Sequence, residues 1–286
     1  DKESNEGNAF LIKKQHAVYL EKSFSDKDFE LYYDHDFKAL TEKILNPSST
    51  DFPLPKGILA ELRPYQVTGY KWLKTLAENG LGGILADDMG LGKTLQSIVY
   101  MASGLEDTTY NEDRIVKDHY LVVCPTSLIY NWLDEIESFA PFLKAAVVSG
   151  PPTEREVTIR DYKKYDIIIT SYPLIRRDIT IYEQIDFHTV FIDEAQFIKN
   201  NASLNSKSVK RIKANNRFAL TGTPIENSLS ELWSIFDFVM PGYLNSHSKF
   251  VEIYEKPILK EDANALEELH MHIEPFILRR MKKDVL

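Results

Sequence analysis

The chain is poor in cysteine and in long apolar runs, and each shortage excludes a class of protein. Its one cysteine, Cys124, rules out an internal disulfide and fits a reducing setting: the cytoplasm or nucleoid of a prokaryote, or the nucleus of a eukaryote. No apolar stretch approaches the roughly 20 residues of a membrane-spanning helix and no secretory signal is visible, so we expect no membrane partner. The net charge of −9 excludes a protein that is basic all over, although a local face is enough to bind nucleic acid.

What is present indicates a globular protein with an appended N-terminal segment. The 286 residues allow one large or two ordinary domains, and 43% hydrophobic with 27% charged residues is the balance of a globular chain. The stretch 46–55 has three prolines among small polar residues and is typical of a linker. We therefore expect an N-terminal appendage and linker (1–56), a central domain (57–242) and a helical extension (243–286).

Short runs rich in Val, Ile and Leu alternate with segments of helical periodicity across the central region. Strands are expected at 83–86, 120–124, 145–148, 166–170, 190–193 and 218–221, and helices at 64–79, 94–104, 127–139 and 206–213. Such alternation predicts an α/β fold of three layers, with a mostly parallel central sheet covered by helices on both faces. After residue 242 we expect helices at 246–254 and 263–273 and no strand.

The most informative segment is 87–94, which reads DDMGLGKT and lies between an expected strand and an expected helix. A glycine turn at a helix N-terminus attracts phosphate through backbone N–H groups, a lysine adds a full charge, and a hydroxyl reaches Mg²⁺. Lys93 would pair with the β and γ phosphates of a nucleotide and Thr94 would ligate Mg²⁺. The pattern is imperfect, because GxxxxGK[ST] needs glycine where this chain has Asp87.

Two acids, Asp193 and Glu194, follow the apolar run 190–192. Acids after a strand are often only solvated loop residues, but a buried strand would deliver these two to the carboxyl edge of the sheet, where ligands bind. Asp193 would hold Mg²⁺, and Glu194 would orient and deprotonate an attacking water. The pair therefore predicts the second half of a nucleotide hydrolysis site.

Six segments occur in an order that is characteristic of one protein family. They are LRPYQVTGYKWL (62–73), DDMGLGKT (87–94), CPTSL with NW (124–132), TSY (170–172), DEAQ (193–196) and LTGTPIEN (220–227). With them, residues 59–286 resemble the first RecA-like lobe of the Swi/Snf family of helicase-related, DNA-stimulated ATPases. LWSIFDFVMPGYL (232–244) and PFILRR (275–280) also resemble this family rather than RNA helicases of the DEAD-box kind.

The resemblance implies a RecA-like P-loop domain that uses ATP and Mg²⁺. Gln66 would contact the adenine edge, and the nucleotide site would be completed by Gly90, Leu91, Gly92, Lys93, Thr94 and Gln196. Two positions depart from the family pattern. Asp88 stands where glutamate is usual, and Gln196 replaces the commoner histidine of the Asp-Glu-x-His box, so coupling to the next motif is expected to differ in detail.

The resemblance also implies a face that binds the phosphates of duplex DNA. Thr126, Ser127 and Ser171 would offer hydroxyl and backbone donors there. Capping of a helix N-terminus, which Ser and Thr favour, explains these residues equally well. Thr221 and Thr223 would link the nucleotide state to the DNA track, with turn chemistry before a proline as the alternative.

A basic run extends from residue 207 to residue 217, with five basic side chains and no acid. Such a run is usually the solvated face of a helix, but its place before the Thr-Gly-Thr motif makes Lys210 and Arg211 candidates for phosphate contacts. Trp132, by contrast, is expected to pack in the core rather than to stack on a base.

Together these observations predict the ATP-binding lobe of a double-stranded DNA translocase. A second RecA-like lobe of the same full-length chain is expected to follow residue 286 and to supply an arginine finger. Two alternatives stay open: an RNA helicase of the same superfamily, and a nucleotide-gated scaffold that does not hydrolyse ATP continuously. The intact acids Asp193 and Glu194 speak against the scaffold.

Overall fold

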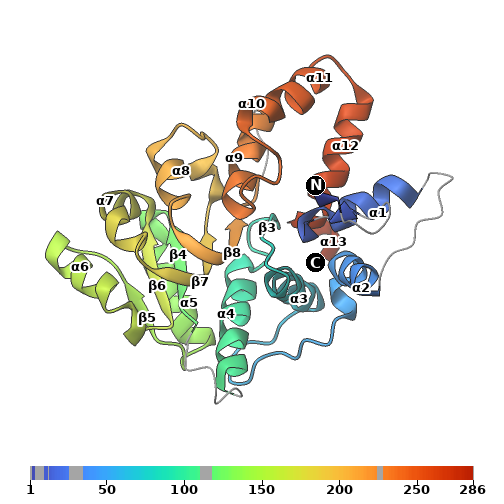
Figure 1. Cartoon of the computed structure of the whole chain (residues 1–286). Coiled ribbons are helices and arrows are strands. Elements are labelled where there is room, and N and C mark those ends of the chain that lie inside the picture. Colours follow the sequence, from blue (N-terminus) through green and yellow to red (C-terminus); the bar gives the residue numbers. More distant parts are fainter. Residues whose placement is uncertain are drawn as a thin grey trace.

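A seven-stranded parallel sheet forms the centre of the computed structural model, in the order β5-β6-β4-β7-β8-β3-β9 (Figure 1). Its strands are β3 (Gly83–Leu85), β4 (Tyr120–Cys124), β5 (Ala145–Val147), β6 (Ile167–Ser171), β7 (Asp186–Ile192), β8 (Lys213–Leu220) and β9 (Ile277–Leu278). Strands β1 (Lys2–Glu3) and β2 (Phe10–Leu11) form a separate antiparallel pair. The structure describes residues 2–3, 10–11, 13–25, 35–109, 118–223 and 228–285.

Helices cover both faces of this sheet and give it three layers (Figure 1). One face carries α3 (Pro64–Glu78), α4 (Lys93–Thr109) and α5 (Ile129–Phe139), and the other carries α6 (Pro152–Arg160), α7 (Tyr172–Tyr182), α8 (Leu204–Val209) and α9 (Leu229–Val239). Strands β4 and β6 are buried at every position because helices exclude water from both sides. The predicted α/β class with a parallel sheet is confirmed.

A helical extension projects from one end of the sheet (Figure 1). It comprises α10 (His247–Phe250), a π-helical turn (Val251–Glu255), α11 (Lys256–Ile258), α12 (Ala263–Ile273) and α13 (Lys282–Val285). The N-terminal helix α1 (Ala17–Ser25) packs on α12, where the rings of Tyr19 and His272 stack with centroids 3.5 Å apart. Helix α2 (His35–Leu45) packs on α1 and α3.

Short 3-10 turns connect several of these elements. They are η1 (Lys14–His16), η2 (Pro47–Ser49), η3 (Thr126–Leu128), η4 (Tyr162–Lys164), η5 (Ala195–Ile198) and η7 (Glu274–Phe276). Turn η2 lies inside the stretch expected to be a linker. Turns η3 and η5 matter most for function, because each follows the carboxyl end of a central strand.

The structure corrects two expectations about secondary structure and adds three helices that were not predicted. The extension does contain a strand, since Ile277 and Leu278 pair in parallel with Ile84 and Leu85. The helix expected at 206–213 ends at Val209, because β8 begins at residue 213 and its ladder with β7 outweighs local helical preference. Helices α6, α7 and α9 were not assigned from the sequence.

Candidate nucleotide site

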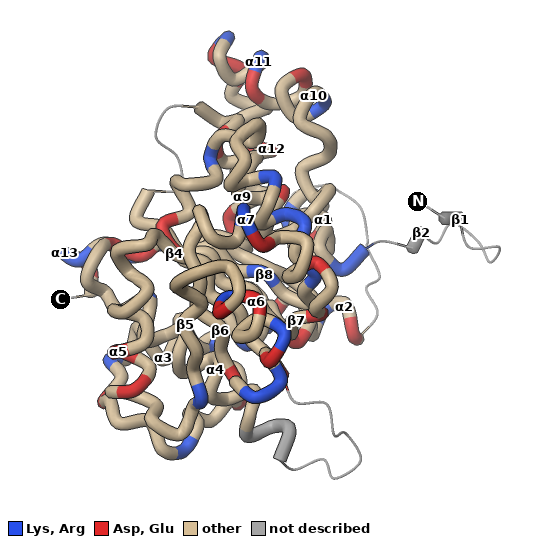
Figure 2. The backbone as a smooth tube through the Cα atoms, turned by 90° about the vertical axis from the view of Figure 1, so that its left-hand side faces the viewer, with Lys and Arg blue, Asp and Glu red and all other residues tan. Residues whose placement is uncertain are grey.

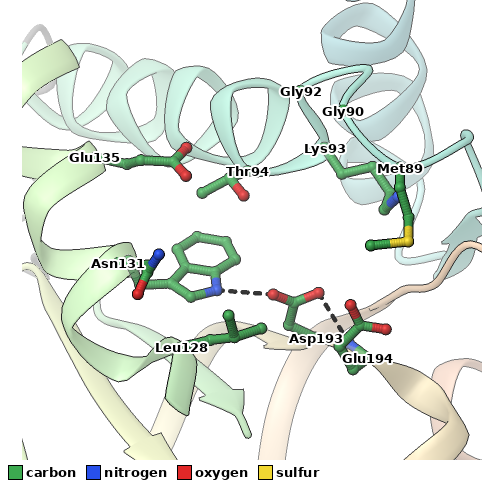
Figure 3. Close-up of a pocket in the computed structure, with 11 residues that line it drawn as sticks. Met89, Gly90, Gly92, Lys93, Thr94, Leu128, Asn131, Glu135, Asp193 and Glu194 are labelled. Atoms are coloured by element: carbon green, nitrogen blue, oxygen red, sulfur yellow. Dashed lines mark hydrogen bonds between the residues drawn. The ribbon is translucent and has the colours of Figure 1, made fainter.

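The glycine loop and the two acids face each other across one pocket of about 300 Å³ (Figure 3). The loop follows β3 and the acids follow β7, and both strands end at the same edge because the sheet is parallel. The lining residues are Met89, Gly90, Gly92, Lys93, Thr94, Leu128, Asn131, Trp132, Glu135, Asp193 and Glu194. Helix α5 thus supplies one wall that the sequence motifs did not reveal.

The loop conformation depends on two glycines. Gly90 and Gly92 have φ of 84° and 77°, a left-handed backbone that glycine adopts without steric cost. A Cβ added to Gly92 would lie 2.5 Å from Nε2 of Gln66, so a larger residue would collide as well. Helix α4 begins directly after Gly92, which leaves its first N–H groups without intrahelical partners. This is the arrangement of a phosphate-binding turn.

Lys93 and Thr94 open helix α4 and extend into the pocket (Figure 3). The Lys93 ammonium donates to the carbonyl of Asp87 at 2.7 Å, which holds it over the loop. Burial lowers the pKa of Lys93, while Asp193 and other nearby acids raise it. Because burial disfavours the charged form of Lys93, a phosphate beside this ammonium would stabilise its charge.

Asp193 is buried, and three groups fix its position. Its Oδ2 accepts from the indole Nε1 of Trp132 at 2.9 Å, and its Oδ1 accepts from the Glu194 N–H at 2.8 Å. Its backbone carbonyl accepts from the hydroxyl of Tyr172 at 2.7 Å. Burial raises the pKa of Asp193 above its ordinary value, although the hydrogen bonds from Trp132 and the Glu194 N–H and the charge of Lys93 lower it. Such a carboxylate gains from a cation beside it.

Glu194 has a left-handed backbone, with φ 51° and ψ 61°, which is rare for a residue with a side chain. Its carboxylate accepts from the Gln196 amide at 2.7 Å. The Thr221 hydroxyl donates to the other end of that amide at 3.5 Å, and accepts from the Thr223 N–H at 3.1 Å. A chain of polar contacts therefore runs from the acid to the segment after β8.

The oxygen donors in the pocket fit a magnesium ion that takes some of its ligands from the protein and others from a nucleotide. Within the described ranges, no group of three or more His, Cys, Asp or Glu side chains comes together as a metal site. Mg²⁺ usually takes one or two protein ligands and completes its shell with phosphate oxygens and water. The Thr94 hydroxyl and the Asp193 carboxylate, which line the same pocket, match that pattern.

Gln66 on α3 contacts the loop at Leu91. The Gln66 side chain accepts from the Arg63 N–H at 2.9 Å and donates to the Leu91 carbonyl at 3.2 Å. Leu91 itself is fully buried. Gln66 therefore touches the loop directly, and its predicted contact with adenine stays a prediction.

Three of the five residues predicted to contact DNA carry hydroxyl groups, and they lie in different environments. Thr126 and Ser127 are exposed on η3, after the carboxyl end of β4. Ser171 ends the neighbouring strand β6 and is only 1% exposed, so its hydroxyl does not reach the surface. A phosphate outside therefore does not reach the Ser171 hydroxyl, and the predicted DNA contacts of Thr126, Ser127 and Ser171 stay predictions.

The basic pair Lys210 and Arg211 is already neutralised within the domain. The Lys210 ammonium lies 2.9 Å from a carboxylate oxygen of Asp237, and burial lowers its pKa. Arg211 donates to Glu183 from its Nε at 3.0 Å. Both cations follow α8 and reach acids of neighbouring elements, Asp237 on α9 and Glu183 at the end of α7, and their predicted phosphate contacts stay a prediction.

Trp132 and Glu135 are the two residues with polar side-chain groups near Asp193 and Thr94 among the pocket residues that were not predicted, which also include Met89, Leu128 and Asn131. Trp132 packs in the core as expected, but its N–H reaches the acid at the site. Glu135 lies one helical turn further along α5 and points toward Thr94 (Figure 3). Burial raises the pKa of Glu135, and the charge of Asp193 raises it further. The sequence could have indicated that Trp132 and Glu135 lie on the same side of the helix, since residues at i and i+3 share a helix face.

Comparison with known proteins identifies the family. The family described as SNF2-related domain matches residues 65–286. The chain belongs to the SNF2-related family. This SNF2-related chain is 43% identical to "TATA-binding protein-associated factor MOT1" of Saccharomyces cerevisiae over 263 residues, 86% of the chain and 14% of that protein. It is 35% identical to "Chromatin-remodeling ATPase INO80" of Mycosarcoma maydis over 284 residues, 92% of the chain and 14% of that protein.

A solved structure agrees with the SNF2-related assignment. The "Sulfolobus solfataricus SWI2/SNF2 ATPase core in complex with dsDNA" matches with a TM-score of 0.72 and 44% identity, covering 81% of this chain and 47% of that one. The SNF2-related chain therefore spans about one seventh of the curated relatives and about half of the solved core. No helix among the described residues has the length and apolar character to span a membrane.

Proposed function

We propose that the protein to which this chain belongs hydrolyses ATP with Mg²⁺, is stimulated by duplex DNA, and uses the cycle to move along DNA and remodel protein–DNA complexes. One observation carries the proposal: Lys93 and Thr94 face Asp193 and Glu194 across a single pocket. Lys93 and Asp193 are 100 residues apart in sequence, so only the fold brings these groups together.

The pocket supplies what phosphoryl transfer requires, which is mainly positioning and charge stabilisation. Lys93 would neutralise charge on the β and γ phosphates. Thr94 and Asp193 would hold Mg²⁺, which neutralises phosphate oxygens when it is bound. Glu194 would orient the attacking water and accept its proton, and its hydrogen bond to Gln196 would transmit the state of the site toward Thr221 and Thr223.

Duplex DNA is the proposed track. The match to an ATPase core solved in complex with duplex DNA supports it, as does the exposure of Thr126 and Ser127 at one edge of the sheet. Figure 2 shows basic and acidic positions interspersed along the backbone on the viewed side, rather than one large basic face. We therefore propose contacts from hydroxyl and backbone donors to phosphates, which read no base sequence and weaken with salt.

A second RecA-like lobe of the same protein is proposed to complete the site. The curated relatives are about seven times longer than the matched region, and the solved core is about twice as long. An arginine finger from that lobe would contribute a factor of about 10³–10⁵ in rate. Relatives named for the TATA-binding protein and for chromatin support a location with DNA, in a nucleus or a nucleoid.

The test is ATP turnover by the complete protein with duplex DNA, with RNA, and without nucleic acid. We expect stimulation by duplex DNA and loss of turnover in Lys93→Ala, while Lys207→Ala, which changes an exposed lysine outside the pocket, leaves it unchanged. Stronger stimulation by RNA would favour an RNA helicase. Nucleotide binding without turnover would favour a scaffold, and turnover retained in Lys93→Ala would overturn the phosphate assignment.

A further inference from the structure

Residues 277–282, which we call the C-terminal strap, lie along β3 and the first residues of the phosphate loop. Strand β9 of the strap pairs with β3, and the pairing continues as the Ala86 N–H donates to the Leu278 carbonyl at 2.7 Å. The Asp88 N–H donates to the carbonyl of Arg280 at 3.0 Å, and the Lys282 N–H donates to the Asp88 carboxylate at 3.0 Å. A continuous series of hydrogen bonds therefore connects the strap to β3 and to the start of the loop.

At the centre of this contact, Arg280 binds Asp87, the residue that replaces the usual first glycine of the loop. The Arg280 Nε donates to Oδ1 of Asp87 at 2.8 Å, and its Nη2 donates to Oδ2. Asp87 is fully buried, and the guanidinium in this two-point pairing is the cation that faces its carboxylate. Removal of one partner would leave an uncompensated charge inside the protein.

The pair continues into the residues that would hold phosphate. The same Arg280 Nη2 donates to Oε1 of Gln96 at 2.7 Å, and the Gln96 amide donates to Asp87 at 3.2 Å and to the carbonyl of Gly92 at 3.2 Å. The backbone carbonyl of Asp87 receives the Lys93 ammonium at 2.7 Å. One guanidinium thus fixes both ends of the glycine turn.

The absence of a side chain at Gly69 leaves room for this guanidinium and for Gln96. A Cβ on Gly69 of α3 would lie 1.7 Å from Oε1 of Gln96 and 2.9 Å from Nη2 of Arg280. The Arg280 guanidinium also lies 5.2 Å from the ring centroid of Tyr65, as a cation over an aromatic ring. Helix α3 is therefore shaped around the side chain of the strap.

We propose that Arg280 is a positioning residue for the phosphate loop, and that through Asp87 it couples the position of the strap to nucleotide binding. This rests on the proposed nucleotide site. A phosphate bound by the loop requires the turn that Arg280 holds, so nucleotide must also favour the strap in its bound position by the same free energy. Asp87, which stands where the GxxxxGK[ST] pattern has glycine, then serves as the counter-ion of Arg280 in the strap.

The experiment compares Arg280→Gln with Arg280→Lys and with Arg279→Gln, which changes an exposed neighbouring arginine of the same strap. In the complete protein, Arg280→Gln should raise KM for ATP about tenfold, equivalent to about 1.4 kcal/mol, with a smaller change in kcat. The KM of Arg280→Lys should lie between those of the wild type and Arg280→Gln, because lysine keeps the charge but cannot form the two-point contact of a guanidinium. Arg279→Gln should match the wild type.

A double-mutant cycle and hydrogen exchange separate positioning from stability alone. Asp87→Asn combined with Arg280→Gln should cost less than the sum of the single changes, since each breaks the same pair. ATP with Mg²⁺ should slow amide exchange in 277–282 of the wild type and of Arg279→Gln, but not of Arg280→Gln. If Arg280→Gln does not fold, Arg280→Lys decides by the same KM and exchange measurements.

Unchanged KM in the Arg280 variants, or strap exchange that ignores nucleotide, would overturn the inference. Failure of the proposed function looks different, because the wild type itself would then lack ATP binding that depends on Lys93.

Discussion

The indole Nε1 of Trp132 donates a hydrogen bond to Oδ2 of Asp193 at 2.9 Å. Trp132 is 2% exposed and lies on α5, whereas Asp193 follows β7, so the bond joins a helix to the end of a central strand. Together with the bond from the Glu194 N–H to Oδ1, it fixes the orientation of a buried carboxylate that lines the pocket. The tryptophan is therefore part of the core and also orients the proposed Mg²⁺ ligand.

Trp132→Phe tests this orientation, because it keeps an aromatic ring and removes the N–H. We expect the Mg²⁺ concentration for half-maximal ATPase to rise about tenfold, as for a lost partner of a metal ligand, and stability to fall by about 1 kcal/mol. The measurements are Mg²⁺ titrations of turnover and denaturant unfolding.

The matched control for that change is Trp233→Phe. Trp233 is also buried, and its N–H bonds to a backbone carbonyl at Asn245, away from the pocket. It should lose stability without a change in Mg²⁺ dependence. Equal Mg²⁺ curves for both variants would show that Trp132 acts through packing alone.

Glu135→Gln should stabilise the protein without nucleotide at pH 7. The folded pKa of Glu135 lies above its ordinary 4.5 because of burial and Asp193, so ionising it costs free energy in the folded state. That cost is present at neutral pH, shrinks as pH falls through the raised pKa, and is absent below about 4.5. The gain in melting temperature should follow the same course. Glu137→Gln, an exposed site on the same helix, should show no such trend.

Thr126 and Ser127 should matter for DNA, whereas Ser171 should not. Replacing both exposed residues with alanine removes two proposed phosphate donors, and we expect about a tenfold rise in the DNA concentration for half-maximal ATPase stimulation. Ser171→Ala changes a side chain that is 1% exposed and should leave that concentration unchanged. The comparison is made at one salt concentration, since phosphate contacts weaken with salt. The reverse ranking would place the DNA elsewhere.

Residues 1–286 alone should bind ATP weakly and hydrolyse it slowly, because the proposed second lobe and its arginine are missing. The expected deficit against the complete protein is about 10³-fold or more in turnover. Single-turnover hydrolysis with and without duplex DNA measures it. Strong DNA-stimulated turnover by this fragment would contradict the two-lobed site.

The sequence was sufficient for the sheet and for the chemical groups at its edge. Buried parallel strands are nearly continuous runs of Val, Ile and Leu, which is why all six expected strands of the central region are present. The motif residues Lys93, Thr94, Asp193 and Glu194 could be named because local strand–turn–helix patterns place them at strand ends. Short elements such as β9 escaped, since two residues carry no periodicity.

The tertiary structure decided which side chains were free and which were already paired. Lys210, Arg211 and Ser171 resemble phosphate ligands in sequence, yet the two cations already form ion pairs with Asp237 and Glu183, and the Ser171 side chain is buried. Arg280 and Asp87 are 193 residues apart, and Trp132 and Asp193 are 61 apart, so no local pattern predicts either bond. Residue type fixes what a group is able to bind, but only packing across the sheet determines which partner it meets.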